Sequence, residues 1–329
     1  MPTWTSWSVA AVPEFRATRT DMSAVLQATP PPHCPLPAVR DEARSVWSAQ
    51  ALRGAAPLWS TRESALYWVD APSQQLHRFQ PAQRLRDSWS LDQPVSALAE
   101  RAGHAGLLLA LRHELAFFDP DTARLELLHR PEPAQPGNRL RAGLCDSQGR
   151  FWCSTAPGTG QSPTGALYRY AGGSRCVRQL ENLGDSPGMT WTRDQQTLLV
   201  ADPTQNRIWA HALETNGQLG PARSWLALPR HEGTPQGLCT DAAGRIWLAR
   251  AGTGRASCHH PETGAELLHI QLPASQLTGC AFGGPQLRTL FITSGSTHAS
   301  AALFSEPLAG ALFAVEVDSP GLPAHLFAG

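Results

Sequence analysis

The sequence predicts an all-β protein, a six-bladed β-propeller that carries a short irregular N-terminal extension. Two observations predict this fold. A unit of roughly 40–50 residues, which reads turn, strand, turn, strand, recurs six times, and repeats of that length are typical of propellers. No amphipathic helical pattern of about 10–15 residues separates the strands, which disfavours an α/β fold.

The first strand of each unit is a short apolar and aromatic run that follows a turn with Gly, Asp, Ser or Gln. These runs span residues 61–70, 102–110, 146–154, 193–202, 241–249 and 284–294, so their starts lie 41, 44, 47, 48 and 43 residues apart. A second strand in each unit begins at Leu76, Leu115, Leu167, Ile208, Arg255 and Leu312. One such unit cannot bury both of its faces alone, so we expect the units to pack against one another around a ring.

Residues 1–44 are expected to form the extension, and residues 45–329 the propeller. The extension contains the run PPPHCPLP at residues 30–37, which suits neither a helix nor a central strand. Its first residues, MPTWTSWSVAAV, lack a basic segment followed by a long apolar one, so no signal peptide is expected.

The composition excludes several classes of partner. Lys plus Arg and Asp plus Glu each number 27, and this balance gives no support for binding to nucleic acid or to a charged membrane surface. No apolar stretch reaches the ~18 residues that a membrane-spanning helix needs. The seven Cys are odd in number and form no C-x-x-C pair. This favours reduced thiols and a cytoplasmic location over a disulfide framework or a zinc site.

Five segments carry a family resemblance: residues 277–294 (LTGCAFGGPQLRTLFITS), 201–209 (ADPTQNRIW), 138–143 (NRLRAG), 165–169 (GALYR) and 241–247 (DAAGRIW). Together they make the chain from about residue 46 onward resemble the gluconolactonase / regucalcin / luciferin-regenerating-enzyme family. The terminal run 321–329 is similar to the closing strand of that family. The resemblance implies a six-bladed propeller that hydrolyses sugar lactones with one divalent cation, Ca²⁺ or Zn²⁺.

The resemblance also implies where the family's metal ligands would lie. Ala55, in the run GAAP at 54–57, stands at the position of a Glu, and Arg141, in RLRAG at 139–143, stands at the position of an Asn. Pro187, in SPG at 186–188, stands at the position of a second Asn. Gln236, in PQG at 235–237, stands at the position of an Asp that is both ligand and base in the family. Hard divalent cations take 6–8 oxygen ligands, whereas these positions offer one neutral amide oxygen and a guanidinium. No metal site, and no cofactor, is therefore predicted.

A binding role for this region remains open. Arg139 matches a substrate-contacting Arg of the family, and with Arg141 and Gln236 it forms the predicted substrate-binding set. Two guanidinium groups at the mouth of an axial pocket suit a small polar or anionic ligand, such as a sugar acid or a lactone. No catalytic residue is assigned.

Four acidic residues are weak candidates for a general base. Asp70 and Asp202 end strands, where an Asp usually accepts backbone N–H groups and holds a turn. Asp185 and Glu232 lie on loops near the family motifs and are expected to be solvated. His231, beside Glu232, belongs to the one His and acid pair near these motifs.

Other reactive residue types have simpler interpretations. His259 and His260 precede a turn and are expected to be exposed. Four Cys in the strand repeats, two of them near the axial loops, are expected to be small core residues: Cys145, Cys153, Cys239 and Cys280.

Three functions stay open. The leading prediction is a non-catalytic or weakly catalytic propeller that has lost its metal site and binds a small polar or anionic ligand. The first alternative is an active sugar-lactone hydrolase with a rebuilt site in which Arg141 polarises the carbonyl. The second is a protein-interaction propeller, because the fold alone does not choose among these roles.

Overall fold

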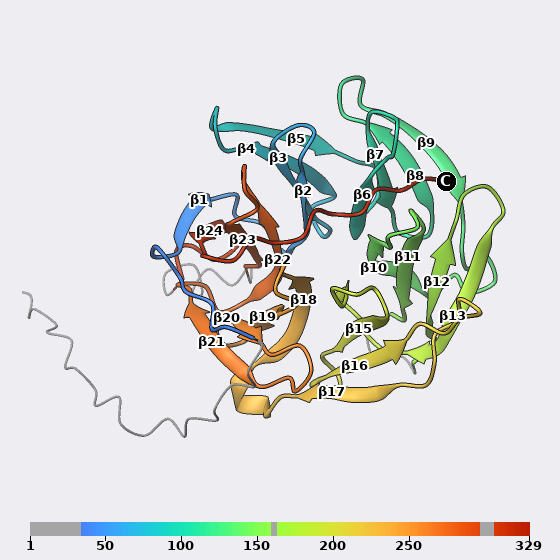
Figure 1. The fold of residues 1–329 in the computed structure, drawn as a ribbon. Coiled ribbons are helices and arrows are strands. Elements are labelled where there is room, and N and C mark those ends of the chain that lie inside the picture. Colours follow the sequence, from blue (N-terminus) through green and yellow to red (C-terminus); the bar gives the residue numbers. More distant parts are fainter. Residues whose placement is uncertain (1–33, 159–162, 297–305) are drawn as a thin grey trace, which may run out of the picture. The chain divides into compact units, whose positions relative to one another are not determined.

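The computed structural model describes residues 34–158, 163–296 and 306–329. The chain divides into two units, Met1–Pro35 and Leu36–Gly329. The second unit consists of six four-stranded antiparallel sheets set around one axis, as Figure 1 shows. The predicted six-bladed propeller is confirmed. The irregular structure expected for the extension falls mostly on residues outside the described ones.

Each of the first five blades is built from four consecutive strands. Blade 1 comprises β2 (Gly54–Ser60), β3 (Ala65–Asp70), β4 (Gln75–Gln80) and β5 (Leu85–Ser90); blade 2 comprises β6 (Ala97–Glu100), β7 (Leu107–Ala110), β8 (Leu115–Asp119) and β9 (Arg124–His129). Blade 3 comprises β10 (Arg139–Cys145), β11 (Phe151–Ala156), β12 (Gly165–Tyr170) and β13 (Cys176–Leu183). Blade 4 comprises β14 (Met189–Trp191), β15 (Thr197–Asp202), β16 (Arg207–Ala212) and β17 (Arg223–Ala227). A 3₁₀ turn, η1 (Arg230–Glu232), precedes blade 5, which comprises β18 (Thr234–Thr240), β19 (Ile246–Ala251), β20 (Arg255–His259) and β21 (Glu266–Gln271).

Blade 6 joins three strands near the C-terminal end of the propeller to the first strand of the propeller. It comprises β22 (Leu277–Gly283), β23 (Thr289–Ser294), β24 (Leu312–Glu316) and, at its outer edge, β1 (Arg44–Trp47). Arg44 pairs with Ala314, so the N-terminal strand covers an edge that would otherwise be left open. Upstream of β1, the Arg40 amide donates to the Glu316 carbonyl at 2.9 Å.

The terminal run 321–329 is not the closing strand, and that expectation is wrong. Gly321 forms an isolated bridge with Asp241 of blade 5, and Phe327 forms one with Arg101 of blade 2. The run therefore crosses one end of the propeller as a strap, visible as the red segment that ends at C in Figure 1. The edge of β24 is already taken by β1, so the C-terminus has no strand edge to complete in blade 6.

The two predicted strands of each unit are confirmed as the middle pair of each blade, β3 and β4 in blade 1 and their equivalents in the others. The innermost and outermost strands were missed, because neither has a strong apolar run. β2 (GAAPLWS) carries Gly and Pro around the axis, and β5 (LRDSWS) is largely exposed. In β3, the second strand of blade 1, all six residues are buried.

Large aromatic side chains fill the space between blades. Trp68 of β3, Trp152 of β11 and Trp247 of β19 are all almost fully buried. Trp152 also makes an edge-to-face contact with Trp191 of the next blade, with ring centroids 5.2 Å apart. None of the seven Cys, all of which the structure describes, forms a disulfide, and burial raises the pKa of Cys145 and Cys153, as expected for core residues. Within the described ranges, no helix has the length and apolar character needed to cross a membrane.

Candidate ligand site at one end of the propeller axis

Topology brings the predicted site residues to one end of the axis. Each blade begins with its innermost strand, so these strands run in the same direction around the ring and their first residues meet at one end. Ala55 is the second residue of β2, and Arg141 and Gln236 are the third residues of β10 and β18. Pro187 lies just before β14.

Glycines let the innermost strands approach closely at this end. A Cβ atom on Gly188 would lie 2.4 Å from the carbonyl oxygen of Gln236, and one on Gly237 would lie 2.6 Å from the Cα of Gly279. A side chain at either position would push neighbouring blades apart. The glycines of the SPG and PQG motifs are thus explained by blade packing rather than by chemistry.

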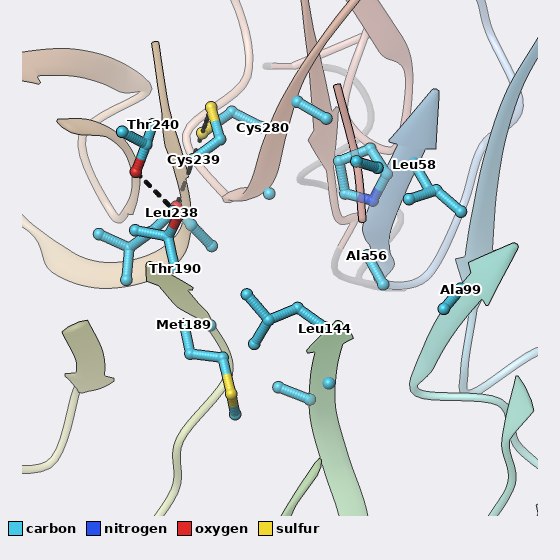
Figure 2. A pocket seen from close by; sticks show the side chains of 18 of the residues that line it. Ala56, Leu58, Ala99, Leu144, Met189, Thr190, Leu238, Cys239, Thr240 and Cys280 are labelled. Atoms are coloured by element: carbon cyan, nitrogen blue, oxygen red, sulfur yellow. Dashed lines mark hydrogen bonds between the residues drawn. The ribbon is translucent and has the colours of Figure 1, made fainter. Parts of the chain in front are cut away.

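A small cavity of about 200 Å³ occupies the axis itself. Figure 2 shows its wall, to which all six innermost strands contribute side chains that are mostly apolar or small. Cys239 and Cys280 face each other across blades 5 and 6 with their Sγ atoms 3.6 Å apart. Burial raises the pKa of the Cys239 thiol well above its usual value, so it is protonated and unreactive at neutral pH.

Polar side chains gather at the end of the axis where the innermost strands begin, and we call Arg53, Arg139, Arg141, Asp185 and Gln236 the mouth cluster. The Nη2 of Arg53 donates a hydrogen bond of 3.1 Å to Oε1 of Gln236, which links blades 1 and 5. Arg141 donates two hydrogen bonds to Asp185, from Nε to Oδ1 and from Nη2 to Oδ2, the second at 3.2 Å. The Arg141 side chain is only 10% exposed.

The charges in the mouth cluster do not cancel. It holds three guanidinium groups and one carboxylate, a net formal charge of +2. Burial and then the charge of Arg141 lower the pKa of Arg53 to about 10, with Asp185 opposing, so Arg53 stays protonated at neutral pH. Burial opposes ionisation of Asp185, but Arg141, with Arg53 and Arg139, outweighs it and lowers the pKa of that carboxyl. An anionic ligand would complete the balance.

A larger groove of about 1000 Å³ opens beside the cluster. Arg53, Arg139 and Asp185 lie along it, and it continues between blades 3 and 4 toward Trp209 and Leu219. Arg139 is exposed and carries no ion pair with the cluster's carboxylate, which Arg141 occupies. A guanidinium on an open wall is well placed to contact a ligand.

The structure therefore brings together Arg139, Arg141 and Gln236, the set predicted for substrate binding. Ala55 is packed among the apolar side chains between blades 1 and 2, and Pro187 lines the axial cavity. Neither contributes a polar side-chain atom.

The predicted roles of the acidic residues are confirmed for two of them and wrong for a third. Asp70 accepts backbone N–H groups from Leu52 and Arg53, at 2.9 and 3.0 Å, and Asp202 accepts that of Gln205 at 3.0 Å, so the structural role predicted for both is confirmed. The expectation that Asp185 is merely solvated is wrong, because Arg141 pairs with it.

Blade 5 contains a second charged network that sequence reasoning missed. Arg250 is 1% exposed and pairs with both Glu232 and Glu266. Its Nη2 also lies 3.2 Å from Nε2 of His259. Glu232 is therefore not a free loop carboxylate, and the expected exposure of His259 and His260 is wrong, since both are buried. A buried Arg needs such partners, and none is near it in sequence.

Arg53 is the functional candidate that sequence reasoning overlooked. It directly precedes the run Gly54-Ala55-Ala56-Pro57, and its backbone is held by Asp70. An Arg beside a motif that lacks its expected Glu is the signal that could have found it. Its reach to Gln236, 183 positions away, could not be read from the chain.

Comparisons with known proteins agree on one family. Residues 53–296 match the SMP-30/Gluconolactonase/LRE-like region. The 6-deoxy-6-sulfogluconolactonase of Pseudomonas putida is 31% identical over 84% of this chain and 95% of its own length. Regucalcin of Xenopus laevis is 29% identical over 73% of this chain and 82% of its own. The crystal structure of a calcium-binding regucalcin from Agrobacterium tumefaciens superposes with a TM-score of 0.82 at 24% identity, covering 87% of this chain and 97% of that one.

Proposed function

Since the chain belongs to the SMP-30/gluconolactonase/LRE-like family, we propose that it is a metal-independent, non-catalytic or weakly catalytic member that binds a small organic anion at the mouth cluster. Sugar acids are the class of ligand we favour. The single observation that carries this proposal is the pair of guanidinium groups, Arg53 on Gln236 and Arg141 on Asp185, at the end of the axis where the resemblance locates the family's cation.

The residues at this end do not fit a divalent cation. Ala55 and Pro187 have no side-chain donor atom, and Arg141 brings a permanent positive charge. The two side chains with oxygen atoms, Gln236 and Asp185, already accept hydrogen bonds from guanidinium groups. Across the described part of the chain, no three His, Cys, Asp or Glu side chains converge in a metal-binding arrangement. The guanidinium of Arg141 would also repel a cation, because repulsion between two unit charges about 4 Å apart costs about 4 kcal/mol at an effective dielectric constant of ~20.

Weak or absent hydrolysis follows from the same contacts. A lactonase without a metal needs a free group to polarise the carbonyl and a base to activate water. Arg141 directs two donors at Asp185, so it is not free. Asp185, whose pKa is lowered, is a poor proton acceptor, and the Gln236 amide accepts no proton near neutral pH. These contacts disfavour the alternative of an active hydrolase with a rebuilt site.

The protein-interaction alternative has less support. The large hydrophobic side chains that are exposed among the described residues include Leu85 on β5, Leu127 on β9 and Val177 on β13. They lie on the outer strands of three different blades, whereas a docking surface is typically one continuous apolar patch. A cytoplasmic location is also proposed, because seven Cys without a disulfide suit a reducing compartment.

Calorimetry with two acids tests the binding proposal. We would titrate the protein with gluconate and with 6-deoxy-6-sulfogluconate, the second because a relative's name includes its lactone. The net charge of +2 in the mouth cluster predicts that the dianionic acid binds more tightly, by about tenfold. Arg53→Gln should weaken both acids, whereas Arg124→Gln, on the exposed outer strand of blade 2, should leave them unchanged.

Hydrolysis of gluconolactone and titration with Ca²⁺ and Zn²⁺ complete the test. We expect no heat from either metal and no turnover above the spontaneous rate, with or without a chelator. Chelator-sensitive turnover would overturn the proposal, because it would require a bound cation. Turnover that survives the chelator and disappears in Arg141→Ala would instead establish the metal-free hydrolase.

A further inference from the structure

The groove between blades 3 and 4 is far larger than a compact sugar acid requires. Its volume of about 1000 Å³ lies at the upper end of the range for pockets that hold drug-sized molecules. The axial cavity, by contrast, measures about 200 Å³. A ligand whose anionic group meets Arg53 and Arg139 would therefore fill only one end of the groove.

The far end of the groove carries several apolar and aromatic side chains, beside the polar Asp202 and His211. Val200 of β15, Trp209 of β16, and Leu219 and Pro221 after β16 contribute to it. The Trp209 ring is fixed from two sides: its Nε1 donates to Asp202 at 3.4 Å, and the Arg207 guanidinium lies 5.2 Å from the ring centroid. An aromatic ring held in this way offers a rigid surface to an apolar group.

A buried hydroxyl without a partner lies between these two ends. Ser186 is 2% exposed, lines the groove, and its Oγ makes no hydrogen bond within the described residues. It is the direct neighbour of Asp185, and therefore adjoins the mouth cluster. Leaving a buried hydroxyl unpaired costs about 1–3 kcal/mol, and a ligand oxygen that pairs with Ser186 would remove this cost.

We propose that the groove binds an amphipathic organic acid, whose anionic head lies between Arg53 and Arg139, whose adjacent oxygen pairs with Ser186, and whose apolar or aromatic tail lies against Trp209 and Leu219. The site assigned to the anionic head rests on the proposed function. The tail is new, because it makes the ligand larger than a simple sugar acid. The amphipathic acid matches the groove at each end, because one end has an excess of guanidinium groups and the other has several apolar side chains and an indole ring.

A series of straight-chain carboxylates tests the tail directly. Calorimetry with propanoate, hexanoate and decanoate should show affinity rising by about threefold to fourfold for each methylene buried, until the tail reaches the end of the groove. Ala222→Phe, at an exposed position on the groove, should shorten the tail that fits and reduce the gain from hexanoate to decanoate at least tenfold. Ala265→Phe, an equally exposed alanine on blade 5, is the matched control and should leave the series unchanged.

The results separate this inference from the proposed function. If Arg139→Gln weakens all three acids equally while Ala222→Phe affects only the long ones, both proposals hold. If gluconate binds but decanoate binds no better than propanoate, the groove is not a tail compartment and the inference is overturned, although the proposed function stands. If the affinity series appears but is unaffected by Ala222→Phe, the tail binds elsewhere and the inference also fails.

Ser186→Ala provides a second, independent readout. Loss of an unpaired buried hydroxyl should leave the thermal midpoint of the free protein unchanged or raise it, while affinity for an acid with an α-hydroxyl, such as 2-hydroxydecanoate, falls about threefold or more relative to decanoate. A drop in thermal stability without any change in this affinity ratio would show that the hydroxyl serves the fold, and would count against the inference.

Discussion

The guanidinium of Arg53 donates a 3.1 Å hydrogen bond to the Oε1 atom of Gln236, joining blade 1 to blade 5 across the end of the propeller axis. Gln236 is 6% exposed, so this contact is largely shielded from water. It uses the one amide oxygen that the four predicted ligand positions retain. The contact thus pairs the neutral side chain of Gln236 with the positive charge of Arg53.

Gln236→Glu tests the importance of that neutral side chain. The change keeps the size of the side chain but converts the hydrogen bond to an ion pair, and lowers the net charge of the mouth cluster from +2 to +1. We expect gluconate affinity measured by calorimetry to fall about tenfold. Gln83→Glu makes the same charge change in an exposed turn and should have little effect. Equal losses in both variants would mean that only the overall charge of the protein matters.

Asp185→Asn removes the only carboxylate of the mouth cluster. Arg141 would lose its partner, and we expect the free energy of unfolding in urea to fall by about 1 kcal/mol, a small value because the Asp185 side chain is 36% exposed. The net charge would rise to +3, so gluconate should raise the thermal midpoint more than it does in the wild type. A variant that is less stable but gains nothing extra from the anion would argue against an anion site here.

Ala56→Gly should stabilise the protein. Ala56 has a φ of +48°, a left-handed conformation that is strained for any residue with a Cβ. Glycine should relieve this strain and raise the free energy of unfolding by about 1 kcal/mol, after its greater unfolded-state entropy is subtracted. Ala55→Gly, at the adjacent position with ordinary φ, is the control and should lose about 0.5–1 kcal/mol. Urea denaturation that ranks the two variants the other way would refute the assigned backbone conformation.

Acid should destabilise the fold through His77. Burial lowers the pKa of His77 to about 4, with Asp70 opposing, and the ring stacks on Trp68 with centroids 4.1 Å apart. Because its pKa is about 6.5 in the unfolded chain, the unfolded state takes up the proton first as the pH falls. Stability should be greatest above pH ~6.5 and decrease toward pH ~4, by about 3 kcal/mol from this group.

Thermal midpoints between pH 4 and 7 measure this effect. His77→Phe retains an aromatic ring for Trp68 and should flatten the decrease, whereas His104→Phe, at an exposed position, should not. A wild-type midpoint that stays constant over this range would contradict the buried neutral state of His77.

The sequence determined the fold because a propeller repeats its signal. Each of six units places a buried second strand after a turn, as in Leu66-Tyr67-Trp68-Val69 of β3, and an error in one unit is corrected by the others. The family resemblance pointed to Gly188 and Gly237, although the innermost strands that carry or follow them were not predicted. Their lack of a side chain reflects close approach between neighbouring blades, which recurs wherever innermost strands converge.

Tertiary structure alone decided which charges meet. Arg141 and Asp185 lie 44 positions apart, and Arg53 and Gln236 lie 183 apart, so no periodicity links them. The strand β1, and not the run at 321–329, closes blade 6, because a sheet edge can be covered by either end of the chain. The sequence determines which residue types lie at the axial end. Their pairing, their combined charge and the neighbouring groove arise only when the ring closes, because closure brings distant loops side by side.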